Sequence, residues 1–168
     1  MARTEIEEIV VPSILDRLTD LDPRATVDPG MTREASELAF KRAVERDVEL
    51  LLNTRRTMIA APEDCPELRH SVYEFGLIDA TGVAVATKAG RERLLDGLRD
   101  ALIRYEPRLA NVRVRLVDAD QVRAPQMRFV VEAMLRVGRE RHQVVFDTVL
   151  EVSRGEYDVK TADEGAAS

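Results

Sequence analysis

Hydrophobic and polar positions in the middle of the chain change their period once, near residue 106. Between residues 91 and 105, the apolar residues recur at the three- and four-residue spacing of an amphipathic helix: Leu94, Leu95, Leu98, Ala101 and Leu102. A proline disfavours helical geometry in the residue before it, so Pro107 predicts that this helix ends near Glu106. From Leu109 onward, apolar residues alternate with arginines, which indicates a half-buried strand. The sequence therefore predicts a rigid helix-to-strand corner at Glu106-Pro107-Arg108.

Helical patterns also precede this corner. Between residues 31 and 53 one apolar stripe follows the helical period, made of Phe40, Val44, Val48, Leu51 and Leu52. Thr32 is a suitable N-terminal cap for that helix. A shorter helix is predicted from Pro66 to Phe75, because proline suits the first helical turn. Thr87 is expected to cap the long helix before the corner.

The last third of the chain alternates with a period of two. The inward positions are predicted to be Phe129, Val131, Ala133, Leu135 and Val137, and then Val144, Phe146, Thr148, Leu150 and Val152. Polar turns at 138–141 and 153–155 separate these strands from each other and from a short strand at 157–159. Consecutive strands joined by tight turns predict an antiparallel meander. The predicted fold class is α+β, with N-terminal helices packed on a C-terminal antiparallel β-meander.

The length of the chain, 168 residues, suits one main domain. We expect a flexible, partner-docking segment over residues 1–30, a single α+β domain over 31–160, and a disordered tail over 161–168. The N-terminal segment holds few apolar residues between turn signals. Its pattern fits equally well a tail docked on its own domain and a segment that becomes ordered on a partner.

Composition and charge argue against several classes of function. The formal net charge of −6 argues against nucleic acid as the partner. No apolar run approaches the roughly 20 residues that cross a bilayer, and the N-terminus lacks the pattern of a secretory signal. One cysteine and two histidines, far apart in the sequence, do not make a metal-ligand spacing. We expect a cytoplasmic protein with no cofactor, no metal and no direct membrane insertion.

The main enzymatic hypothesis for this sequence is acid–base hydrolysis. A glycosidase needs two carboxyl groups about 5–10 Å apart, one of them kept protonated. Glu106 is the best-placed candidate, but Arg104 and Arg108 favour its ionised form. The chain has no tryptophan, no phosphate-binding glycine loop and no nucleophile elbow. A structural or interface ion pair is the preferred interpretation of Glu106, and the chain is not expected to be an enzyme.

The predicted sheet carries an excess of arginine. Seven arginines fall between Asn111 and His142, against four acidic residues: Arg113, Arg115, Arg123, Arg128, Arg136, Arg139 and Arg141, against Asp118, Asp120, Glu132 and Glu140. One interpretation is a solvated sheet face. The other is a basic surface that meets an acidic partner, with a strand edge available for strand addition.

Several stretches, in this order along the chain, resemble one known family. They are SILDRL (13–18), RAVERDVELLLNTRR (42–56), PELRHSVYEFGL (66–77), YEPRL (105–109) and FDTVLEV (146–152), followed by Gly155-x-Tyr157-x-Val159. They resemble the TssE group of type VI secretion baseplate subunits, within the gene-twenty-five-like lysozyme family of contractile phage tails. The resemblance covers about residues 13 to 159.

The resemblance implies a structural baseplate wedge component that initiates assembly of the contractile sheath through protein–protein contacts. The implied partners are the wedge subunits TssF and TssG and the sheath subunits TssB and TssC. The family's Glu-Pro-Arg motif falls on the corner, where it would dock the subunit on the wedge. The predicted partner-binding residues are Leu15, Arg17, Leu18, Glu106, Pro107, Arg108, Arg113, Arg115 and Arg128. A peptidoglycan hydrolase, as the family's historical name suggests, and a generic adaptor outside secretion remain the alternatives.

Overall fold

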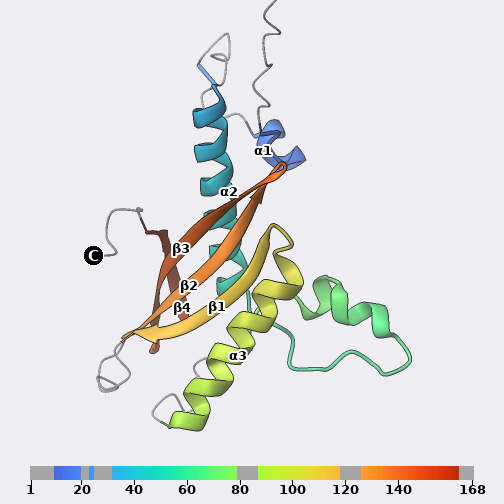
Figure 1. Cartoon of the computed structure of the whole chain (residues 1–168). Coiled ribbons are helices and arrows are strands. Elements are labelled where there is room, and N and C mark those ends of the chain that lie inside the picture. The colour runs from blue at the N-terminus through green and yellow to red at the C-terminus, as the bar shows by residue number, and fades with distance from the viewer. Residues whose placement is uncertain (1–9, 20–22, 25–31, 79–86, 118–125, 163–168) are drawn as a thin grey trace, which may run out of the picture. The chain divides into compact units, whose positions relative to one another are not determined.

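The computed structural model describes residues 10–19, 23–24, 32–78, 87–117 and 126–162 (Figure 1). The chain divides into two compact units, residues 1–44 and residues 45–168. Helix α2 (Arg33–Asn53) begins in the first unit and ends in the second.

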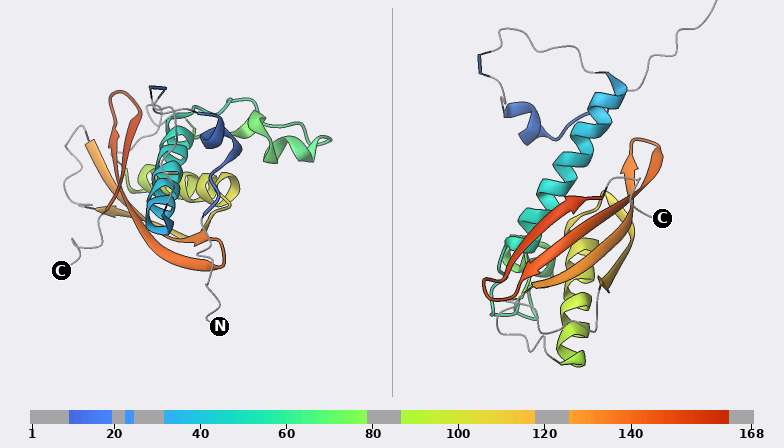
Figure 2. Two further views of the ribbon diagram at one scale, coloured as in Figure 1. Left: turned by 90° about the horizontal axis from the view of Figure 1, so that it is seen from above. Right: turned by 90° about the vertical axis from the view of Figure 1, so that its left-hand side faces the viewer.

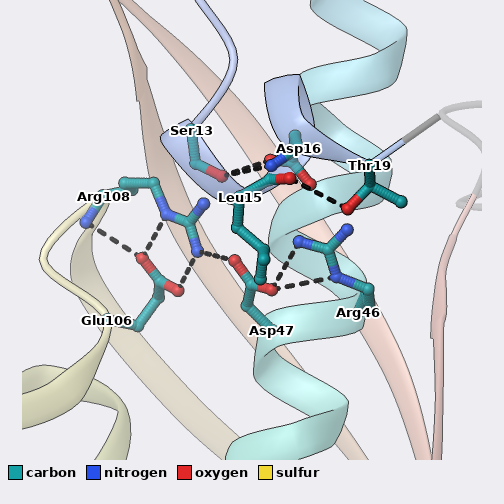
Figure 3. A network of polar contacts seen from close by, with 8 residues as sticks. All are labelled: Ser13, Leu15, Asp16, Thr19, Arg46, Asp47, Glu106 and Arg108. Atoms are coloured by element: carbon teal, nitrogen blue, oxygen red, sulfur yellow. Dashed lines mark hydrogen bonds and ion pairs between the residues drawn. The ribbon is translucent and has the colours of Figure 1, made fainter.

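The first unit contains the short helix α1 (Ile14–Leu18), which Ser13 caps. The Ser13 hydroxyl oxygen accepts the Asp16 backbone N–H at 3.2 Å and donates to the Asp16 carboxylate at 2.6 Å (Figure 3). The cap satisfies one of the backbone donors that the start of a helix leaves unpaired, the Asp16 N–H. The apolar side chains of α1 remain outside any core, since Ile14, Leu15 and Leu18 are 77%, 68% and 78% exposed.

The second unit contains a four-stranded antiparallel sheet with the order β1-β2-β3-β4. The strands are β1 (Leu109–Val117), β2 (Gln126–Val137), β3 (Glu140–Glu151) and β4 (Glu156–Thr161). The predicted α+β class and the predicted meander are confirmed. The turn between β2 and β3 is shorter than expected, because only Gly138 and Arg139 lie between the strands. Gly138 has a φ of +58°, which suits a two-residue hairpin.

One face of the sheet forms the core of this unit. The predicted inward residues of β2 and β3 are buried, with Phe129, Phe146 and Leu150 at most 1% exposed. The exception is Val152, which lies in the turn after β3 and is only partly buried. Helix α3 (Lys88–Tyr105) packs against β1 and buries Leu98 and Leu102, and the end of α2 lies on the same face (Figure 2). Each large apolar side chain buried in this way contributes about 1.5–3 kcal/mol relative to exposure.

The predicted helix from Pro66 to Phe75 is wrong. Two short 3₁₀ helices, η1 (Pro66–His70) and η2 (Val72–Glu74), occupy this stretch. Ser71 separates them with an extended backbone, and its hydroxyl accepts the Tyr73 N–H at 3.1 Å and donates to the Leu68 carbonyl at 2.9 Å. Such local bonds to a serine side chain compete with the helical pattern, and the hydrophobic period did not reveal them.

Strand β1 contains a bulge that the alternation did not predict. The register with β2 shifts between Ala110 and Arg113, and Asn111 has a φ of +54°. Asparagine tolerates this left-handed conformation better than most residues. Because of the extra residue, Leu109 and Val112 are both buried, whereas Arg113 and Arg115 are exposed.

Candidate functional site

The helix-to-strand corner forms as the sequence predicts. The Thr87 hydroxyl accepts the Gly90 N–H at 3.0 Å and so caps the start of α3. Glu106 is the C-cap of α3, and its backbone N–H donates to the Leu102 carbonyl at 3.0 Å. The Leu109 N–H then donates to the Glu106 carbonyl at 3.1 Å, which closes the turn around Pro107. The corner backbone is therefore bonded on both sides of the proline.

Both carboxylate oxygens of Glu106 are bonded to Arg108 (Figure 3). Nε of Arg108 donates to Oε1 at 2.6 Å, Nη2 donates to Oε2 at 2.5 Å, and the Arg108 backbone N–H donates to Oε1 at 3.2 Å. The Glu106 side chain is only 5% exposed. Its hydrogen bond raises the pKa of the Arg108 guanidinium above the ordinary value, against the opposing effect of burial. The result is a bidentate, charge-assisted pair held in a protein interior.

Asp47 completes this cluster from the second half of α2. Nη2 of Arg108 donates to Oδ2 of Asp47 at 2.7 Å, and Arg46 binds the other carboxylate oxygen at 2.8 and 3.1 Å (Figure 3). We call Asp47, Glu106 and Arg108 the corner clamp. The sequence did not predict a role for Asp47, because one acidic residue on a charged helix face carries no signal of a partner 61 positions away.

The corner clamp does not suit acid–base catalysis. A general acid has to keep a proton and reach a substrate. Glu106 is 4% exposed as a residue, and its carboxylate is fully occupied by Arg108. What the corner presents to solvent is Pro107 and part of Arg108, whose side chain is 25% exposed. The corner is therefore a rigid support with a small exposed part. We call this part, Pro107 and the exposed portion of Arg108, the corner tip.

Residues 54–56, which follow α2, form backbone hydrogen bonds with Leu77. The Arg56 N–H donates to the Leu77 carbonyl at 2.7 Å, and the Leu77 N–H donates to the Thr54 carbonyl at 2.8 Å. This close approach requires Gly76, which has a φ of +104° and whose substituted Cβ would lie 2.2 Å from the Thr54 oxygen. Nearby, the Glu74 carboxylate lies 3.1 Å from Nη1 of Arg104 on α3.

Asn53, at the end of α2, is bonded to strand β4. Its side-chain amide donates to the Tyr157 carbonyl at 2.8 Å, and its side-chain oxygen accepts the Tyr157 N–H at 2.8 Å. The hydrophobic pattern of the sequence gave no indication of these two bonds. The α2 end thus connects segments that are distant in sequence: the corner through Asp47, the loop before α3 through Thr54, and β4 through Asn53.

A family model described as Baseplate wedge protein gp25 matches residues 39–140. The chain belongs to this family. The matched range includes the corner clamp and most of the residues that brace it. Its role is therefore structural, in the baseplate of a contractile tail or a related machine, and it assembles there with other baseplate proteins. The search of the curated proteins gave no match. In the described part of the chain, no helix has the length and apolar character that a membrane crossing demands.

In this gp25-family chain, the predicted partner-binding residues fall into three places. Glu106, Pro107 and Arg108 form the corner. The N-terminal residues lie in the first unit, in α1, and are all exposed: Leu15, Arg17 and Leu18. The remaining arginines are exposed on the sheet face that points away from the core, on β1 and β2: Arg113, Arg115 and Arg128. Arg123, Asp118 and Asp120 lie outside the described residues.

Proposed function

We propose that this chain is a wedge subunit of a type VI secretion baseplate, acts in the cytoplasm, and starts assembly of the contractile sheath through protein–protein contacts. The corner clamp is the observation that carries the proposal. Ion pairs around the buried Glu106 join the end of α3 and the second half of α2 to the residue before the first strand, which favours a surface of fixed geometry. A preformed surface loses little conformational freedom on binding, which favours ordered assembly.

The wedge contact is proposed for the corner tip. Pro107 and part of Arg108 are exposed there, while the buried Glu106 carboxylate holds the Arg108 side chain in place by hydrogen bonding. The proposed partners are wedge subunits of the TssF and TssG kind, in keeping with the Glu-Pro-Arg resemblance. Glu106 acts in this proposal as a positioning residue and does not touch the partner.

The N-terminal helix α1 is proposed as a second docking element. Leu15 and Leu18 expose most of their surface, and Arg17 is exposed beside them. A capped helical turn with outward leucines suits burial in a groove of another protein. The sheath contact, with subunits of the TssB and TssC kind, is proposed for the sheet, whose exposed Arg113, Arg115 and Arg128 favour an acidic partner.

A peptidoglycan hydrolase is the competing function. Its test is a cell-wall turbidity assay with the purified chain and with Glu106→Gln. The occupied Glu106 carboxylate leads us to expect no clearing with either protein. Clear lysis by the wild type that Glu106→Gln abolishes would overturn the structural proposal.

The main test is co-purification from native cells. The tagged wild type is compared with Pro107→Asp, which changes the corner tip, and with Lys88→Asp, which changes an exposed residue at the other end of α3. A thermal melt first establishes that all three are folded. We expect wild type and Lys88→Asp to carry wedge and sheath proteins, and Pro107→Asp to lose the wedge proteins. If the wild type carries no baseplate or sheath protein, the proposed function is wrong.

A further inference from the structure

The outer face of the sheet, which points away from α3 and the end of α2, carries a row of apolar side chains (Figure 2). Successive residues of a strand point to opposite faces, so the neighbours of the buried β2 and β3 residues lie here. The register places Val145 diagonal to Val130 and Met134, and Val149 diagonal to Val130. All four side chains are partly exposed. They form a continuous apolar stripe in the middle of the outer face.

The charged residues at the two ends of the outer face differ in sign. At the end that holds the β2–β3 turn, Arg136 lies directly opposite Arg141. We call these two residues the basic pair. At the other end of β3, Glu151 lies directly opposite Glu156 of β4, and we call these two the acidic pair. The outer face is therefore basic at one end of β3 and acidic at the other, with the apolar stripe between them.

Each of these pairs is unfavourable within a single copy of the chain. Like charges directly opposite each other on neighbouring strands destabilise the strand pairing. Within the described residues, neither Arg136 nor Arg141 has an acidic partner. Glu156 has an ion pair with Arg154 there, at 3.8 Å between two exposed side chains. A surface of opposite charge at each end would relieve both repulsions.

We propose that the outer face binds a second copy of this chain, with the two sheets face to face and their β3 strands antiparallel. A two-fold axis across the middle of β3 brings the basic pair of each copy over the acidic pair of the other. The two apolar stripes then meet at the centre. Sheets packed face to face lie about 10 Å apart, a distance that opposing arginine and glutamate side chains can span.

Charge and size both favour a second copy as the occupant. A purely acidic partner would complement the basic pair alone, whereas a second copy complements both ends at once. Strands β2 and β3 have 12 residues each, and with the shorter β1 and β4 the face covers roughly 600–700 Å². Two copies bury about 1,200–1,400 Å² in total, which is the lower end of the range for specific interfaces. The dimer is therefore expected to be weak.

Sedimentation velocity of the purified full chain is the first test. We expect a monomer–dimer equilibrium with a Kd of about 10–100 μM in about 50 mM NaCl. Because charges meet at both ends, about 500 mM NaCl should weaken the dimer roughly 3- to 10-fold. The ¹⁵N amide spectrum of the wild type should show concentration-dependent shifts centred on β2 and β3. A chain that stays monomeric at about 500 μM, or shifts centred on another element, would overturn the proposal.

Charge reversal tests the arrangement of the two copies. Arg136→Glu with Arg141→Glu makes both ends of the face acidic, and Glu151→Arg with Glu156→Arg makes both ends basic. We expect each double variant alone to dimerise at least ~10-fold more weakly than wild type. An equimolar mixture of the two variants should form a heterodimer about as tightly as the wild-type dimer, because opposite charges again meet at both ends. A mixture that stays monomeric would overturn the antiparallel arrangement.

Two further variants serve as controls, and thermal melts first establish that every variant is folded. Lys88→Glu with Glu92→Lys reverses an exposed ion pair on α3 and should leave the dimer unchanged. Leu15→Asp with Leu18→Asp changes the exposed apolar side chains of α1 and should also leave it unchanged. A dimer that the α1 variant loses and both charge-reversal variants keep would show that the outer face is the wrong surface.

This inference does not rest on the proposed function, although the two concern neighbouring surfaces. Arg128, which is proposed to meet the sheath, lies opposite Val149 on the same outer face, so the dimer and the sheath contact exclude each other. If wild type dimerises but carries no baseplate or sheath protein in the co-purification, the proposed function fails and the dimer stands. If wild type carries these proteins but stays monomeric, the dimer is wrong and the proposed function stands.

Discussion

Arg108 bonds both carboxylate oxygens of Glu106, at 2.6 and 2.5 Å, in a place where the Glu106 side chain is 5% exposed. A buried carboxylate without its cation is costly, so the two residues depend on each other. This relationship makes the Glu-Pro-Arg corner an internal support of the fold, which leaves only Pro107 and part of Arg108 exposed.

Loss of Arg108 is expected to destabilise the chain strongly. Arg108→Met leaves Glu106 charged and unpaired, and we expect the free energy of unfolding to fall by about 3–5 kcal/mol. Urea unfolding followed by circular dichroism measures it. The control is Arg115→Met, which removes an ion pair at a side chain that is 65% exposed, with an expected cost below about 1 kcal/mol. Equal costs for the two variants would contradict the role of the corner clamp.

A double variant isolates the pair itself. Glu106→Gln with Arg108→Met removes both charges, so we expect it to cost less than the sum of the two single changes. The same unfolding experiment gives the coupling free energy. Additive single effects would show that Glu106 and Arg108 act independently of each other.

Alanine substitutions at Gly76 and Gly97 are expected to change stability in opposite directions. Gly76→Ala places a Cβ 2.2 Å from the Thr54 carbonyl oxygen at a φ of +104°, so we expect a loss of at least about 1–3 kcal/mol. Gly97 lies inside α3 with nothing within 4 Å of its substituted Cβ. Gly97→Ala is therefore expected to gain about 0.5–1 kcal/mol. Thermal melts of both variants against wild type provide the measurement, and a stable Gly76→Ala would refute the tight contact.

Asn53 is expected to protect the β4 edge. Asn53→Ala removes both bonds to the Tyr157 backbone and should cost about 1–2 kcal/mol, because this site is partly exposed. Hydrogen exchange at the Tyr157 amide should accelerate more than exchange in β2. The control Leu50→Ala changes an exposed residue on the same helix and should leave that amide protected. Unchanged exchange in Asn53→Ala would mean that the edge is held by other contacts.

Because of Tyr157, the folded chain is expected to lose stability at alkaline pH. Burial raises the pKa of its phenol above the ordinary value of 10.0. A pKa that is raised on folding contributes stability at pH values below the unfolded pKa, and that stability is lost as the pH rises toward the folded pKa. We expect wild type to lose more stability than Tyr157→Phe between pH 9 and pH 11, as measured by urea midpoints. Among the described residues its buried hydroxyl has no hydrogen-bond partner, so Tyr157→Phe should be stable at pH 7.

The sequence by itself determined the elements whose cause is local. Pro107 restricts its neighbour wherever it stands, so the end of α3 at Glu106 was predictable. The period of two in β2 and β3 fixed which side chains are buried, and short polar turns fixed the meander. The same reasoning failed at Ser71 and at Asn111, where one side chain or one extra residue changes the backbone without altering the hydrophobic pattern.

The tertiary structure alone decided which polar groups meet. Asp47 bonds to Arg108, which lies 61 positions away in the sequence, and Asn53 bonds to Tyr157, which lies 104 positions away. No periodicity encodes such pairs, because they depend on how the end of α2 packs against the corner and β4. That packing also decides that the β4 edge is covered, while the β1 edge is not bonded by any other described segment. The sequence determined that the sheet has two edge strands, and only the packing of α2 distinguished one from the other.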